Sequence, residues 1–159
     1  MTVSELEAYG VETMDETAID EFLSGQSAGV LGLPDEQAPY LLPLSYAFDG
    51  EDRLYFTFVL GESSRKGELA VRTELARFLV YEAETPFRWR SVLLTGGLER
   101  VPEERWPEIR DVLADAWRPN TLDTAATSGG VEVYEFVVED QSGVEQDGLA
   151  PDFRENVDP

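Results

Sequence analysis

The sequence predicts a mainly β protein of the α+β class, a small antiparallel β-barrel with helices around it. Three observations lead to this fold. Several segments alternate apolar and polar residues, or form short apolar runs, between turn signals. Only three segments have apolar residues at the spacing of an α-helix. The 159 residues, 42% of them hydrophobic, suffice for one domain with a buried core. Many strands with few helices favour a barrel.

The first third of the chain predicts a helix, a strand and a hairpin. Residues 13–25 read as an amphipathic helix, because Thr13 and Glu16 have capping-box spacing and Gly25 can end it. Residues 27–33 read as a strand. Residues 39–48 and 53–60 form a hairpin around an acidic turn, and each strand has one apolar face. These faces consist of Tyr40, Leu42, Leu44, Tyr46 and Phe48, and of Leu54, Phe56, Phe58 and Leu60.

One proline marks a special place in this hairpin. Pro43 has no N–H to donate, so its strand lies at an edge or frays there. A frayed apolar strand with free backbone groups can serve as the wall of a ligand site.

The rest of the chain adds two helices and three strands. Residues 64–73 predict a short helix, and 75–82, 89–101 and 131–138 predict strands. Gly96 and Gly97 indicate a bulge or barrel corner in the second of these strands. Residues 102–117 predict a helix with Pro102 at its first position. Its core face consists of Trp106, Ile109, Val112, Leu113, Ala116 and Trp117. We expect one domain over 1–148 and a polar tail over 149–159.

The charge of the chain excludes two classes of partner. Thirty-three acidic residues against 12 basic ones leave a formal net charge of −21, which repels nucleic acid and anionic membranes. The acidity marks either an interaction surface or adaptation to high salt. We favour a halophilic protein, because the acidic residues are spread along the chain. Close acidic pairs such as Glu82 and Glu84 are therefore interpreted as solvated surface, and no metal site is predicted.

Missing residue types exclude further chemistry. There is no cysteine and no histidine, so the sequence offers no thiolate, no disulfide and no imidazole base. The N-terminus lacks the pattern of a signal peptide, and no apolar run reaches membrane-spanning length. We expect a cytoplasmic protein.

The only lysine of the chain, Lys66, is the best candidate for a functional residue. It follows Ser63, Ser64 and Arg65 after a glycine, at the start of a predicted helix. The free N–H groups and the dipole of a helix start favour an anion, and two cationic side chains add charge-assisted hydrogen bonds. The segment is either an anion site or an ordinary helix start with two exposed cations.

Two motifs resemble the FMN-binding segment of the pyridoxamine 5'-phosphate oxidase-like split-barrel flavoproteins. They are Arg53-Leu-Tyr-Phe-Thr57 and Ser64-Arg-Lys66, and the order of elements agrees from residue 13 to about residue 145. Residues 39–46 and 90–92 resemble most the nitroimidazole-resistance-like and general flavin-nucleotide-binding branch. The resemblance implies a six- to seven-stranded antiparallel split β-barrel with flanking helices. It also implies a homodimer with FMN sites at the subunit interface.

The resemblance also assigns roles to residues. Residues 41–46 would lie along the flavin ring and contact it through backbone groups. This segment includes Leu42, Pro43, Leu44, Ser45 and Tyr46. Phe56 and Thr57 would contact the ring or the ribityl chain, and Ser64, Arg65 and Lys66 would hold the phosphate. Trp89 and Ser91 would reach the flavin from the facing subunit. The competing interpretations are core packing for Phe56, interface packing for Trp89 and an ordinary strand position for Ser91.

Several residues depart from the family pattern. The oxidases have an arginine where this chain has Leu41, a substrate-binding lysine at Tyr46, and a C-terminal histidine that is absent here. The nitroimidazole-resistance branch often has a histidine at the position of Thr57. Oxidation of pyridoxamine phosphate is therefore not expected.

Four hypotheses for the function remain. The first is an FMN-dependent oxidoreductase with an unknown substrate and no identified catalytic residue, in which Tyr46 is a candidate helper. The others are a flavin carrier without turnover, a protein that binds the deazaflavin F420, and a structural dimer without a ligand.

Overall fold

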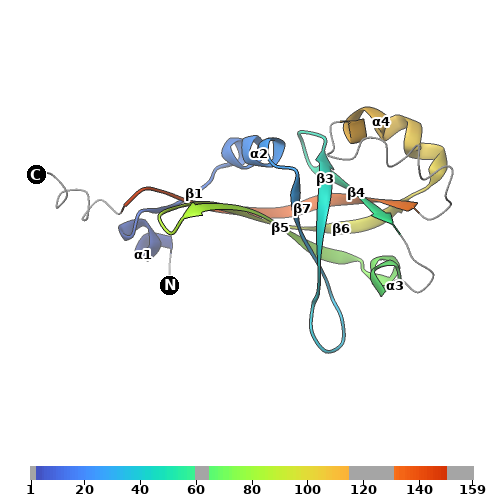
Figure 1. Ribbon diagram of the computed structural model, residues 1–159, viewed down its shortest axis with the longest axis horizontal. Helices are drawn as coiled ribbons and strands as arrows, with labels where there is room; N and C mark the ends of the chain where they lie inside the picture. The colour runs from blue at the N-terminus through green and yellow to red at the C-terminus, as the bar shows by residue number, and fades with distance from the viewer. Residues whose placement is uncertain (1–2, 60–64, 115–130, 150–159) are drawn as a thin grey trace, which may run out of the picture.

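In the described part of the chain, seven antiparallel strands form one sheet that closes on itself (Figure 1). A computed structural model describes residues 3–59, 65–114 and 131–149 of the chain. The strand order is β1-β7-β4-β3-β2-β5-β6, and β7 also pairs with β6. Six strands therefore make a closed barrel and β1 is an addition to it, which confirms the predicted barrel. The strands are β1 Val11–Thr13, β2 Ala28–Leu33, β3 Tyr40–Phe48, β4 Arg53–Val59, β5 Leu75–Thr85, β6 Arg88–Val101 and β7 Val131–Asp147.

The last strand is much longer than its sequence predicts. Residues 131–138 alternate clearly, but β7 runs for 17 residues to Asp147. Its first part pairs with β4, its second part pairs with β1, and β6 accompanies it from Val101 to Arg88. The polar stretch 139–147 has no apolar alternation, although Gln141 and Gly143 lie opposite the core residues Leu94 and Val92 of β6. Strand pairing across the sheet holds this stretch, and local pattern cannot reveal it.

Aromatic and aliphatic side chains fill the barrel. Phe56, Phe78 and Phe136 are fully buried and their rings contact one another. The two predicted apolar faces of the hairpin are confirmed where they are described, since these side chains belong to the core or pack against it. Helix α3, Arg65–Arg72, closes one end of the barrel with Leu69 and Ala70, each 2% exposed. Residues 60 and 64 of the predicted elements lie outside the described residues.

The helix near the N-terminus begins later than predicted. Helix α2 spans Glu16–Gly25, and the carboxylate of Asp15 caps it by accepting the Ala18 N–H at 2.8 Å. Thr13 belongs to β1, so the predicted capping box is wrong. Aspartate and threonine side chains can both cap a helix. Because β1 pairs with β7, Thr13 belongs to a strand, and Asp15 is the residue that caps α2. Helix α1, Val3–Ala8, and strand β1 were not predicted.

A helix covers part of the outer barrel surface. A short 3-10 helix at Glu103–Arg105 precedes α4, Trp106–Ala114, and residues 115–117 of the predicted helix lie outside the described part. Pro102 is the cap of the 3-10 helix, so the prediction that it takes the first helical position is wrong. Ile109 and Leu113 are buried against a second apolar cluster, which also contains Ala47, Tyr55, Val101 and Val133.

A buried carboxylate ties this helical segment to the sheet. Glu135 of β7 is 6% exposed and accepts a hydrogen bond from the Tyr55 hydroxyl at 3.1 Å. The guanidinium groups of Arg53 and Arg105 lie 3.8 and 3.5 Å from the same carboxylate oxygen. Two cations and a hydroxyl therefore compensate the cost of burying this charge. Burial and the neighbouring Glu135 raise the pKa of Tyr55.

Two special residues of the sequence have the predicted surroundings. The register of β6 against β7 shifts between Thr95 and Gly96, which confirms the bulge. Pro43 lies in a half of β3 that has β2 on one side alone, because β4 pairs with β3 only from Tyr46 to Phe48 among the described residues. The prediction of an edge at Pro43 is thus confirmed. No helix in the described part is long and apolar enough to cross a membrane.

Candidate functional site

Strand β3 divides the predicted flavin-lining segment between two faces. Successive side chains of a strand point to opposite sides of the sheet. Leu42 and Leu44 pack against the barrel core, and Tyr46 is buried in it. Pro43 is exposed and Ser45 is partly exposed, on the outer face. A ligand outside the barrel would therefore meet two of these five side chains, together with backbone groups of the others.

The outer face of four neighbouring strands carries a continuous apolar surface. In register across β3, β2, β5 and β6 lie Pro43, Val30, Leu79 and Leu93. Leu41 on β3 and Tyr81 on β5 flank this row, and their side chains are 67% and 60% exposed. We call these six residues the outer apolar row. Exposed apolar surface of this extent on a sheet is typical of an interaction site.

The side chains of Tyr46 and Phe56 serve the core. The Tyr46 hydroxyl donates to the Leu23 carbonyl at 2.6 Å, and burial raises the pKa of Tyr46 far above its usual range. A group so engaged is not available as a helper in chemistry outside the barrel. Phe56 is 0% exposed, and its ring centroid lies 4.8 Å from that of Phe78. Of the two interpretations of Phe56, core packing is therefore the one that its side chain fits.

The predicted phosphate segment is described in part. Thr57 lies on β4 in register with Val133 and is partly exposed. Helix α3 begins at Arg65, so Arg65 and Lys66 occupy its first turn. Ser64 and the side chains of Arg65 and Lys66 lie outside the described part. The first N–H groups of any α-helix have no partner within the helix, so this backbone geometry suits an anion.

Trp89 and Ser91 lie on β6, on the same outer face as Pro43 and Ser45. Ser91 is two residues from Leu93 of the outer apolar row, and Trp89 two residues further. They therefore follow the row toward the turn between β5 and β6. Figure 1 shows this turn beside α1, whereas α3 lies at the other end of the long axis. One chain consequently does not bring Trp89 and Ser91 to its own α3.

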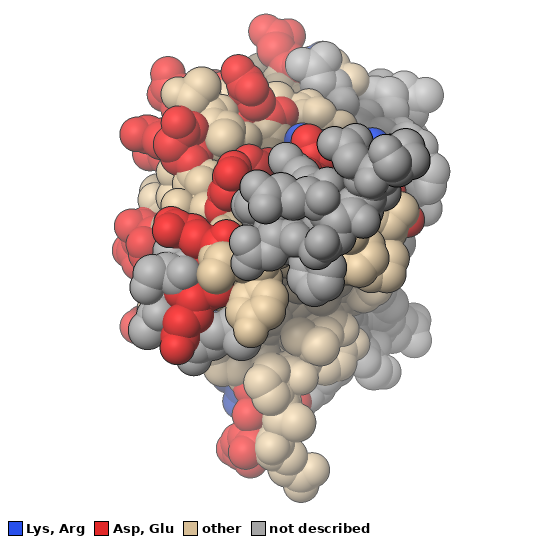
Figure 2. All heavy atoms as spheres, turned by 90° about the vertical axis from the view of Figure 1, so that its left-hand side faces the viewer, with Lys and Arg blue, Asp and Glu red and all other residues tan. Residues whose placement is uncertain are grey.

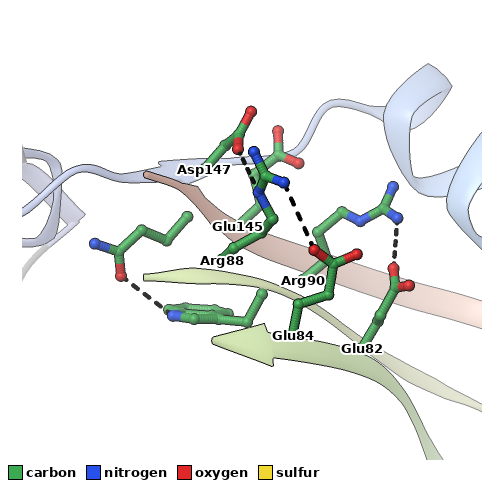
Figure 3. Close-up of a pocket in the computed structure, with 8 residues that line it drawn as sticks. Glu82, Glu84, Arg88, Arg90, Glu145 and Asp147 are labelled. Carbon is green, nitrogen blue, oxygen red and sulfur yellow. Dashed lines mark hydrogen bonds and ion pairs between the residues drawn. The ribbon is translucent and has the colours of Figure 1, made fainter. Parts of the chain in front are cut away.

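Charged side chains surround a cavity of about 260 Å³ at the Trp89 end (Figure 3). Arg88 pairs with Asp147 at 3.1 Å and with Glu84 at 3.7 Å, and Arg90 pairs with Glu82. The cavity is lined by Glu82, Glu84, Arg88, Trp89, Arg90, Glu145, Gln146 and Asp147. A second hollow of about 540 Å³ lies beside the C-terminal half of α3. Neither is the predicted phosphate position.

Three carboxylates come together at the turn between β3 and β4. Those of Asp49, Glu51 and Asp52 lie within 4.8 Å of one another and are exposed. Asp49 accepts the backbone N–H groups of Glu51 and Arg53 at 2.9 and 3.1 Å. These bonds define the turn, so the carboxylate of Asp49 has a structural role.

Sequence reasoning missed the outer apolar row and the residue that contacts Trp89. A signal for the row was present, because Phe78-Leu-Val-Tyr81 and Val92-Leu-Leu94 are apolar at successive positions. A strand with apolar residues on both faces has both faces covered. Gln146, which accepts the Trp89 indole N–H at 3.2 Å, lies in the unpredicted part of β7 and had no such signal.

A family model matches most of the chain. Residues 15–145 match the model of the family described as pyridoxamine 5'-phosphate oxidase. No curated protein matches the sequence.

Solved structures share the fold at low sequence identity. A FAD-binding protein from Mesorhizobium loti is 23% identical with a TM-score of 0.67, covering 86% of this chain and 97% of that one. A FAD and heme binding protein from Mycobacterium smegmatis is 19% identical with a TM-score of 0.71, covering 93% and 78%. At these identities the likeness concerns the fold alone.

Proposed function

The chain belongs to the pyridoxamine 5'-phosphate oxidase family, and we propose that it binds a flavin, namely FMN, at the interface of a homodimer. The observation that carries the proposal is the position of Arg65 and Lys66. They begin α3, which follows β4 where the ladder between β3 and β4 has ended. A helix start with two cations suits a phosphate monoester, and the flavin ring would lie along the free half of β3.

The outer apolar row supports the homodimer. An exposed apolar face of four strands is stabilised when a second copy covers it. The separation of Trp89 from α3 within one chain agrees with this arrangement. In a dimer built on this face, Trp89 and Ser91 of one subunit would approach the cofactor held by α3 of the other.

The cofactor itself tests the proposal. We expect the purified protein to be yellow and to release FMN on denaturation, as chromatography of the extract would show. FAD is the first alternative, because two of the solved structures with this fold are those of FAD-binding proteins. F420 is the second alternative. A protein that neither carries flavin nor takes it up when it is added would contradict the proposal.

A single substitution tests the phosphate site. We expect Lys66→Ala to weaken FMN binding by about 10- to 100-fold, because a charge-assisted hydrogen bond contributes about 1.5–3 kcal/mol. Arg72→Ala is the matched control, since Arg72 is a cation in the last turn of the same helix. Flavin fluorescence titration measures both. Equal loss in both variants would indicate general electrostatics and not a site at the helix start.

Matched tyrosines test the dimer. Tyr81 of the outer apolar row and Tyr9 before β1 are equally exposed, at 60% each. Tyr81→Lys would place a charge in the apolar interface, so we expect a monomer that has also lost flavin. Tyr9→Lys should remain a dimer. Light scattering after gel filtration gives the mass, and a Tyr81→Lys protein that remains dimeric would exclude this face.

Turnover separates two versions of the proposal. Bound flavin supplies redox chemistry, and the residues of this chain bind and orient it. An oxidoreductase with an unknown substrate is the first version, and a flavin carrier is the second. We favour the first, and expect NADH or NADPH to bleach the flavin absorbance under anaerobic conditions. Flavin that stays oxidised with both donors would favour the carrier.

A further inference from the structure

Gln146 connects three segments at the far end of β7. Its amide oxygen accepts the indole N–H of Trp89 at 3.2 Å. Its amide nitrogen donates to the Tyr9 carbonyl at 3.1 Å and to the Gly148 carbonyl at 3.3 Å. The bonds therefore join β6, the turn before β1 and the end of β7 through one side chain.

The chemistry of the partners determines the orientation of this amide. An indole N–H only donates, so it must face the amide oxygen. A backbone carbonyl only accepts, so Tyr9 and Gly148 must face the NH₂ group. A flipped amide would lose all three hydrogen bonds. The indole is thus bound to an acceptor that is itself held by two other bonds.

Strand register places the amide and the indole on one face. Gln146 lies directly opposite Trp89 on β6 and directly opposite Val11 on β1. Opposite residues of an antiparallel pair have their side chains on the same side of the sheet. That side is the outer face, which Trp89 shares with Ser91. Trp89 remains partly exposed there, with its N–H engaged.

We propose that Gln146 is a positioning residue that holds the Trp89 indole in the orientation in which it meets the flavin of the partner subunit. The inference rests on the proposed function. An exposed tryptophan on a strand has two rotatable side-chain bonds, and binding must immobilise them. Gln146 orders the ring before the cofactor arrives, so less conformational entropy is lost on binding.

Removal of the amide tests the proposal. We expect Gln146→Leu to bind FMN about 3- to 10-fold more weakly, the factor that corresponds to ordering one large side chain. Gln141→Leu is the matched control on the same strand, where the residue lies opposite Leu94. Fluorescence titration with FMN measures both, and the control should bind as the wild type does.

A signal from the indole separates positioning from general destabilisation. The chain has three tryptophans, so its proton–nitrogen spectrum contains three indole signals, and Trp89→Phe identifies one. In flavin-free Gln146→Leu, the Trp89 N–H signal should shift upfield and exchange faster with water. The signals of the other two tryptophans should stay unchanged.

A carboxylate at this position gives a readout that depends on pH. In Gln146→Glu the ionised side chain accepts from Trp89 but repels the two carbonyls, whereas the protonated form can donate to one of them. FMN affinity relative to the wild type should therefore be low at neutral pH and recover as pH falls toward about 5. A purely structural defect would not recover.

Each outcome has one meaning. Wild-type affinity in Gln146→Leu, or an unchanged Trp89 signal, would overturn the role of Gln146 while leaving the proposed function intact. A wild-type protein that takes up no flavin would overturn both the proposed function and the role of Gln146 toward the cofactor. The indole signal would then still report whether the bond between the two side chains exists.

Discussion

At the residue scale, the face of the strand on which a side chain lies decides what it can do near the candidate site. Tyr46 and Ser45 are neighbours in the sequence, yet Tyr46 is 3% exposed and Ser45 lies on the outer face. The phenol of Tyr46 satisfies the Leu23 carbonyl near the end of α2. The aromatic residue thus stabilises the barrel, and the small polar one is free for a ligand.

This hydrogen bond has a measurable effect on stability. We expect Tyr46→Phe to lower the free energy of unfolding by about 1–2 kcal/mol at neutral pH, because the buried Leu23 carbonyl loses its donor. Urea denaturation measures the change. Tyr81→Phe is the control, since the Tyr81 side chain is 60% exposed. Equal stability of Tyr46→Phe and wild type would show that water replaces the phenol.

Buried phenols also predict a loss of stability in alkali. Burial and the adjacent Glu132, to which its hydroxyl donates, raise the pKa of Tyr134 to about 12, and the pKa of Tyr46 lies higher still. Unfolded tyrosines titrate near about 10, so the unfolded chain loses these protons first. Their contribution is complete below pH 10 and decreases as pH rises through the folded pKa. Tyr46→Phe should show a shallower decrease than the wild type.

At the element scale, the bulge between β6 and β7 depends on one glycine of two. A Cβ on Gly96 would lie 2.2 Å from the Val137 carbonyl oxygen, whereas one on Gly97 would meet nothing closer than 3.7 Å. The dipeptide predicted a bulge, but not which glycine needs to lack a side chain. The close approach of β7 determines that, and it depends on residues forty positions further along the chain.

Alanine substitutions distinguish the roles of Gly96 and Gly97. We expect Gly96→Ala to destabilise the protein by about 1–3 kcal/mol, because backbone must move to admit the methyl group. Gly97→Ala should change stability by less than about 0.5 kcal/mol. Thermal unfolding of both variants gives the comparison. Equal stability of both variants would show that the strands separate freely at this point.

At the scale of the whole molecule, negative charge accumulates with few cations to balance it. Figure 2 shows one end of the molecule, where acidic side chains occupy much of the view and basic ones little of it. The described ion pairs join arginines to carboxylates, but 12 cations cannot neutralise 33 acidic residues. Self-repulsion therefore opposes the compact state, and a dimer would bring two such charges together.

Salt should relieve this repulsion. We expect the melting temperature to rise between 0.1 and 1 M KCl, over which the Debye length falls from about 10 to about 3 Å. Each 1 kcal/mol of repulsion that salt relieves should raise the melting temperature by about 2–4 °C. Differential scanning calorimetry measures the rise, and potassium glutamate in place of chloride controls for anion binding. A melting temperature independent of salt would contradict the halophilic interpretation.

The sequence by itself determined the features that a few neighbouring residues specify. Alternation defined β3 and β4, Pro43 marked the free half of β3, and Lys66 stood out by composition. Tertiary structure alone decided what depends on distant strands: the length of β7, the cap at Asp15, the outer apolar row and the contact of Gln146 with Trp89. The physical reason is that the hydrophobic period and the secondary-structure propensity of a segment depend on a few neighbouring residues. Register, and with it the face on which each side chain lies, is set by partners far away in the chain.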